Sequence, residues 1–176
     1  MPVEMKYTPV AAALHWITVV LVCLLYGLGW FMTDLSPGPD RGLYFAAHKS
    51  LGLTLALVMV LRLGWRIANP PPPLQVVALD WRAQLAEIIH FSFYVLLFAQ
   101  PLAGYLSSSF SGYDTSWFGY PLSTWGWEDA LFNKIFTATH KLLSIVILAC
   151  IVLHVIGTMT HVYSEGWSFL RRIRPW

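Results

Sequence analysis

Charge is scarce in this chain of 176 residues, because Asp, Glu, Lys and Arg together make up only 11% of it. A soluble domain averages about 25% charged residues. A chain this short cannot hide 57% of hydrophobic residues from water, so the composition predicts a protein that uses lipid as part of its solvent. No charge of one sign dominates either. The net charge of +2 gives no reason to expect a nucleic-acid partner.

Cysteine is equally rare. The two cysteines, Cys23 and Cys150, lie inside apolar stretches and have no CxxC spacing. We interpret both as small buried apolar residues, which do not report the redox compartment.

What the sequence has in abundance is long apolar runs. Four of them are long enough to cross a hydrocarbon core of about 30 Å, which needs about 20 helical residues. They cover roughly residues 10–32, 44–66, 84–106 and 135–160. Only a helix satisfies its own backbone in lipid at this length. The expected fold class is therefore all-α, an integral membrane four-helix bundle that forms a single transmembrane domain over residues 1–176.

Breaks between the spans are marked by Pro and Gly. Residues 36–39 (Ser-Pro-Gly-Pro) close the first span, and four prolines at residues 70–73 stop the second and favour a stiff polyproline II connector. The polar and aromatic stretch 107–134 is expected to cover one mouth of the bundle, with a short helix near residues 128–133. Pro101 and Gly104 predict a kink in the third span.

Basic residues predict the orientation, since they accumulate on the cytoplasmic side. One side carries Lys6, Arg62, Arg66, Arg82, Arg171, Arg172 and Arg174, and the other carries Arg41, Lys49, Lys134 and Lys141. Both termini are then cytoplasmic, in a bacterial inner membrane. The first span is too long for a signal-peptide core and lacks an A-x-A cleavage site, so we expect a retained helix.

Histidines inside the spans carry most of the functional information, because intramembrane polar groups are costly. His140 and His154 lie 14 residues apart on the fourth span. In a helix this is about 21 Å along the axis and within about 40° on one face. His48 matches the depth of His140, and His15 matches the depth of His154.

Two histidine pairs stacked across the bilayer can ligate two haem irons. Structural zinc is less suited, since it needs four clustered N or S ligands. His90 remains an alternative to His15 as the inner ligand, because both lie at a similar depth.

Small residues and cations near these histidines suit haem. Ala11, Ala12, Gly52, Ser144 and Gly157 lie about one turn from a ligand and would let a flat ring approach. Haem propionates need cations, which Lys49 and Lys141 offer outside, and Arg62 and Arg66 inside, although these arginines also serve as topology anchors. His90 and His161 are either ordinary interfacial residues or the lining of a quinone pocket beside the inner haem.

The ordered set of six histidines on four spans resembles the bacterial cytochrome b561 family. The matching residues are His15-Trp16, His48-Lys49, Arg62, Arg66, His90, His140-Lys141, His154 and His161. The resemblance covers nearly the whole chain. It implies two haem b groups, at His48/His140 and His15/His154, and, for a member of this size, oxidation of periplasmic superoxide with ubiquinone as the electron acceptor.

Two functions follow from this resemblance. The first is a superoxide:ubiquinone oxidoreductase, in which Lys49, Lys141 and their basic neighbours draw the anion toward the outer haem, although acidic residues lie on the same side. The second is an electron-relay subunit that exchanges electrons with a redox protein partner, such as a dehydrogenase. A non-redox role as a haem carrier or membrane scaffold is a third reading.

Overall fold

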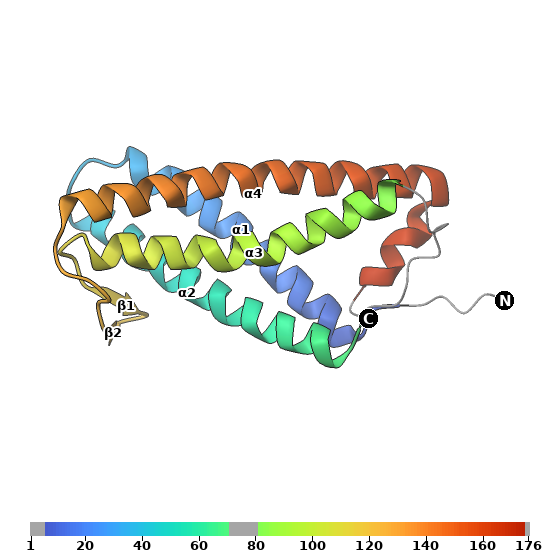
Figure 1. Cartoon of the computed structure of the whole chain (residues 1–176), viewed down its shortest axis with the longest axis horizontal. Helices are drawn as coiled ribbons and strands as arrows, with labels where there is room; N and C mark the ends of the chain where they lie inside the picture. Colours follow the sequence, from blue (N-terminus) through green and yellow to red (C-terminus); the bar gives the residue numbers. More distant parts are fainter. Residues whose placement is uncertain (1–5, 71–80, 175–176) are drawn as a thin grey trace.

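The computed structural model describes residues 6–70 and 81–174 (Figure 1). It contains four long helices: α1 (Pro9–Asp34), α2 (Pro39–Ala68), α3 (Trp81–Ser109) and α4 (Ala130–Glu165). Strands β1 (Thr115–Trp117) and β2 (Tyr120–Leu122) form a hairpin between α3 and α4, and a 3₁₀ helix, η1 (Trp167–Ile173), follows α4. All four long helices are apolar enough to span a membrane, so the expected four-helix membrane bundle is confirmed.

The helices extend beyond the ends of the apolar runs. The second begins at Pro39 rather than near residue 44, and the fourth covers 130–165 rather than 135–160. Polar caps begin α4, where Asp129 accepts from Leu131 N and Phe132 N, and α1, where Thr8 accepts from Ala11 N at 3.2 Å. The second helix instead begins with a proline, which suits the first turn of a helix. The short helix expected at 128–133 is the first turn of α4. The connector expected at Pro70–Pro73 lies almost entirely outside the described residues.

Proline does not end the third helix. Pro101 lies inside α3, which continues to Ser109, and the axis of α3 bends along its length (Figure 1). A proline removes one backbone hydrogen bond and crowds the preceding turn, which accounts for a bend within a continuous helix.

The four helices associate as two pairs. α1 packs along α2 and α3 along α4, with α2 and α3 joining the pairs. Within the described residues, α4 makes almost no close backbone approach to α1 or α2. One side-chain link does cross this gap, because the Tyr26 hydroxyl on α1 donates to the Ser144 carbonyl on α4 at 2.5 Å.

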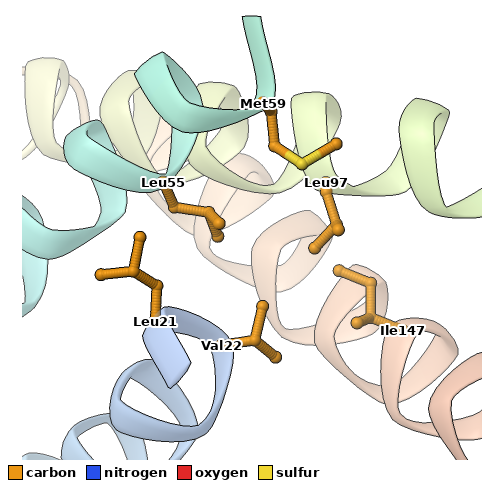
Figure 2. Packing of buried hydrophobic residues seen from close by; sticks show 6 residues of the cluster. All are labelled: Leu21, Val22, Leu55, Met59, Leu97 and Ile147. Atoms are coloured by element: carbon orange, nitrogen blue, oxygen red, sulfur yellow. The ribbon is translucent and has the colours of Figure 1, made fainter. Parts of the chain in front are cut away.

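The gap is filled at mid-bundle by a central cluster, which we define as Leu21, Val22, Leu55, Met59, Leu97 and Ile147 (Figure 2). Four of its members are one heptad away from the intramembrane histidines: Val22 from His15, Leu55 from His48, Leu97 from His90, and Ile147 from both His140 and His154. Seven residues advance a helix by about 10 Å and return nearly to the same face. The central cluster therefore separates two levels of histidines that point into the same interior.

The two ends of the bundle differ in their cover. At one end the hairpin packs on α2, and its two-residue turn uses positive φ at Phe118 (48°) and Gly119 (88°). At the other end η1 is tied to α1, since Trp16 Nε1 donates to the Ile173 carbonyl at 3.1 Å. We call these the hairpin end and the η1 end.

The expectation for the cysteines was half right. Cys150 is buried, but Cys23 is exposed on the surface of the bundle. A thiol is apolar enough to face lipid, and so an apolar stretch alone does not distinguish a lipid-facing cysteine from a packed one.

Ile147→Ala should destabilise the bundle through the central cluster, because Ile147 is only 2% exposed. The expected loss is about 2–5 kcal/mol, the usual range for such a buried truncation. Ile145→Ala is the matched control, since Ile145 lies on the same helix and is 66% exposed. Thermal unfolding in detergent measures both variants. Equal losses from the two would contradict the assignment of the core.

Candidate functional site

The first histidine pair lies toward the hairpin end and bridges the two helix pairs. His48 on α2 and His140 on α4 have ring centroids 6.2 Å apart, with their planes at 79°. Metal–nitrogen bonds are about 2 Å long, so two imidazoles on opposite sides of one metal ion have centroids about 6 Å apart. The spacing of the pair matches a shared iron.

The protonation of His140 is fixed by Gln100 on α3. His140 Nδ1 lies 2.9 Å from the Gln100 carbonyl, which only accepts, so Nδ1 carries the proton. The Gln100 amide nitrogen lies 3.3 Å from Nε2 and donates to its lone pair. Both contacts select the tautomer with its proton on Nδ1, and the Nδ1 contact is of the kind that metal-ligating histidines make through their second nitrogen. A metal at Nε2 would take the place of the Gln100 amide.

Two buried polar atoms lie at this pair without a hydrogen bond of normal geometry among the described residues: Gln100 Oε1 and His48 Nδ1. The backbone carbonyl of Leu25 interacts with the His48 ring and is the acceptor available to it.

Glycines admit the rings of this pair. A Cβ at Gly104 would lie 3.1 Å from His140 Cε1 and Nδ1, closer than normal packing, and one at Gly29 would lie 3.5 Å from His48 Cε1. At Gly52 and Gly157, by contrast, a Cβ would meet nothing within 4 Å, so both predicted small-residue positions leave space beside their helices. The donor set, its spacing and these glycines fit a flat, iron-bearing ring.

The second group lies toward the η1 end and contains three histidines. The rings of His90 and His154 are 5.2 Å apart on the packed helices α3 and α4. His15 on α1 interacts electrostatically with both of them. The structure thus brings together the ligand predicted for His154 and its alternative.

Arg62 on α2 selects a tautomer of His15 that is opposite to the tautomer of His140. Its Nη2 atom lies 3.0 Å from His15 Nδ1, and because arginine only donates, Nδ1 must accept and a neutral ring carries its proton on Nε2. Both Arg62 and Arg66 lie over the Tyr94 ring, with their guanidinium carbons 5.9 and 5.6 Å from its centroid. The predicted cations are therefore next to the second group of histidines.

Three other predicted residues have different neighbours. His161 stacks on Phe169 of η1, with centroids 4.7 Å apart and planes at 10°. Lys49 donates to the Asp114 carbonyl at 3.2 Å, which ties it to the loop before the hairpin. Lys141 is exposed on α4, where it lines a shallow pocket of about 320 Å³ together with Asn133, Lys134, Thr137 and Ala138.

Sequence reasoning missed Gln100 and Tyr94 at these sites, and Tyr26 in the gap between them. Each is a polar side chain within an apolar span, which was the available signal. Their partners come from other helices and could not be read from the spacing along one helix.

Comparison with known proteins agrees with these sites. The sequence model of the prokaryotic cytochrome b561 family matches residues 6–173. Cytochrome b561 homolog 2 of Escherichia coli (strain K12) is 36% identical over 128 residues, which cover 70% of this chain and 63% of that relative, less than two thirds of its length. Cytochrome b561 homolog 1 of the same organism is 24% identical over 180 residues, which cover 97% of this chain and 97% of that relative. The probable superoxide oxidase CybB of Yersinia pestis is 26% identical over 175 residues, which cover 97% of this chain and 96% of that relative.

A family match over nearly the whole chain implies haem b, for which the histidines and glycines above provide a fitting set of residues. The four apolar helices make the chain a multi-pass bacterial membrane protein. The chain belongs to the prokaryotic cytochrome b561 family of membrane electron-transfer proteins.

Proposed function

We propose that this chain is a di-haem oxidoreductase that takes electrons from superoxide at the hairpin end and delivers them to ubiquinone at the η1 end. The observation that carries the proposal is the His48–His140 pair, whose spacing and tautomer suit a haem iron close to the end covered by the hairpin. The near full-length likeness to a probable superoxide oxidase supports the choice of donor. Two superoxide ions each lose one electron to give oxygen, and one ubiquinone gains two electrons and two protons.

One haem is held by His48 and His140 and the other by His15 and His154. Both pairs join α4 to a helix of the α1/α2 pair, across the gap between them. His90 and His154 lie on packed helices with centroids only 5.2 Å apart, which is less than the 6 Å or so that a shared iron needs. His15 is therefore our choice for the ligand opposite His154. The haem irons supply the one-electron chemistry when bound.

Arg62 and Arg66 act as cations for the propionates of the second haem. When Arg62 pairs with a carboxylate, it no longer donates to Nδ1 of His15. The His15 ring can then carry its proton on Nδ1 instead of Nε2, which leaves the Nε2 lone pair available as a ligand. Arginine suits this role because its fork binds a carboxylate through two hydrogen bonds.

His90 is our candidate for the proton donor to ubiquinone. It lies beside His154, with Arg62 and Arg66 nearby, whereas His161 is stacked on Phe169. Histidine suits proton traffic at neutral pH. The excess of basic residues at the η1 end predicts a cytoplasmic η1 end and a periplasmic hairpin end, and we take residues 1–176 as one cytochrome domain.

Replacing single histidines by Ala tests the ligands through the amount of haem b per polypeptide. His48→Ala, His140→Ala and His15→Ala should each leave one haem, and the double variant His48→Ala/His15→Ala should leave none. His90→Ala is the matched control and should keep two. Two haems in His15→Ala together with one in His90→Ala would reassign the ligand opposite His154.

Gly104→Ala should disturb the first haem, because the added methyl would lie 3.1 Å from the His140 ring. We expect less haem b per polypeptide and a shifted absorption band for what remains. Gly27→Ala is the control, since a Cβ there meets nothing within 4 Å. The assignment of His140 is wrong if Gly104→Ala keeps both the haem content and the spectrum of the unaltered protein.

The donor is tested with the purified chain alone in detergent. An enzymatic source of superoxide should reduce the haem b absorption bands rapidly, a short-chain ubiquinone analogue should reoxidise them, and superoxide dismutase should abolish the reduction. In the same assay Lys141→Gln should slow the reduction and weaken its dependence on ionic strength. Haems that ignore superoxide would instead identify a relay that needs a protein partner.

A further inference from the structure

We propose that the tip of the β1–β2 hairpin is immersed in the lipid interface, where it anchors the α3–α4 connection in the membrane leaflet at the hairpin end. The partner of this surface is the boundary between lipid headgroups and acyl chains. The inference does not depend on the electron donor, the acceptor or the direction in which the chain crosses the membrane.

Composition is the first support. No charged residue occurs between Thr115 and Trp127, although the connection is flanked by Asp114 and Glu128. The same stretch contains Trp117, Phe118, Tyr120, Trp125 and Trp127. Aromatic side chains of this kind concentrate where protein meets the membrane interface.

Position along a spanning helix is the second support. The hairpin packs beside α2 (Figure 1), and Trp117 Nε1 donates to Thr54 Oγ1 at 3.1 Å. Thr54 lies six residues beyond His48 on α2, which is about 9 Å further along the helix toward mid-bundle. Lys49 holds the preceding loop nearer the end of the helix, through the Asp114 carbonyl. The turn of the hairpin is therefore aimed along α2 rather than away from the membrane.

Backbone satisfaction is the third support. A strand edge that enters lipid must have its polar backbone groups paired, since no water is available there. Ser50 on α2 is 3% exposed; its hydroxyl accepts from Phe118 N at 3.0 Å and lies 3.4 Å from the Ser116 carbonyl. Thr115 at the start of β1 is buried and bonded to Ser108 at 2.6 Å. The inner edge of the hairpin is thus closed by α2 and α3.

The outward side chains remain uncovered. Phe118 is 67% exposed and Tyr120 is 69% exposed, and they flank the turn at Gly119. The backbone of Phe118 is bonded to Ser50 of α2, a helix long and apolar enough to span the membrane. Lipid is therefore the partner whose chemistry matches both the apolar rings and the single polar hydroxyl of Tyr120.

A spin label tests this placement in the haem-loaded full-length chain. In a Cys23→Ala/Cys150→Ala background, Phe118→Cys and Tyr120→Cys carry the label at the tip. Tyr113→Cys is the matched control: Tyr113 is 76% exposed but lies before Asp114, outside the uncharged stretch. Each protein is placed in phospholipid nanodiscs, and its haem b spectrum checks the fold.

Oxygen concentrates in lipid and a nickel chelate stays in water, so the two relaxation agents report the depth of the label. We expect the oxygen effect at positions 118 and 120 to exceed the nickel effect several-fold, with the reverse at 113. Tip labels as open to nickel as position 113 would overturn the proposal. So would tip labels shielded from both agents, which would show a protein contact. The two tip positions are independent, so either one decides if the other variant fails to bind haem.

Discussion

The gap that separates α4 from the α1/α2 pair determines where everything else in this bundle lies. At mid-bundle the central cluster fills it with apolar side chains, and Tyr26 bridges it with a hydrogen bond to Ser144. One heptad on either side, the same helix faces present histidines in place of Leu, Ile or Val. The histidine rings therefore lie at two levels, with the apolar cluster between them. The heptad thus sets the separation of the two histidine levels.

The two levels differ in the tautomer that hydrogen bonds select for their histidines. At the hairpin end Gln100 donates to Nε2 of His140 and accepts from Nδ1, so the ring already has the tautomer of a metal ligand. At the η1 end Arg62 donates to Nδ1 of His15, which selects the opposite tautomer. A negatively charged group that draws Arg62 away changes this preference. A propionate has that charge. The haem would therefore attract Arg62 through its propionate and, by doing so, make Nε2 of His15 available as a ligand.

Sequence patterns predicted the parts of this structure that depend on a single helix. Length and hydropathy gave the four spans, and the spacing of His140 and His154 gave two levels on one face of α4. Relations between helices were less accessible. The approach of His90 to His154, the contact of Gln100 with His140 and the tie of Lys49 to Asp114 depend on how helices rotate and tilt against one another. The hairpin was missed because three-residue strands leave no periodicity to read, and its turn needs positive φ at Phe118, an unusual residue there.

The chemistry of the central cluster constrains how charge crosses the bundle. Its six side chains are hydrocarbon or thioether, and none can carry a proton. Electrons pass such a barrier by tunnelling, whereas protons need polar groups or water, and the Tyr26 hydroxyl that packs against the cluster is bonded to the Ser144 carbonyl. If ubiquinone is reduced at the η1 end, as we propose, its protons would come from that end, where His15, His90 and His154 are gathered. Electron delivery from the hairpin end would then move negative charge across the membrane without a compensating proton, and the proposed reaction would be coupled to the membrane potential.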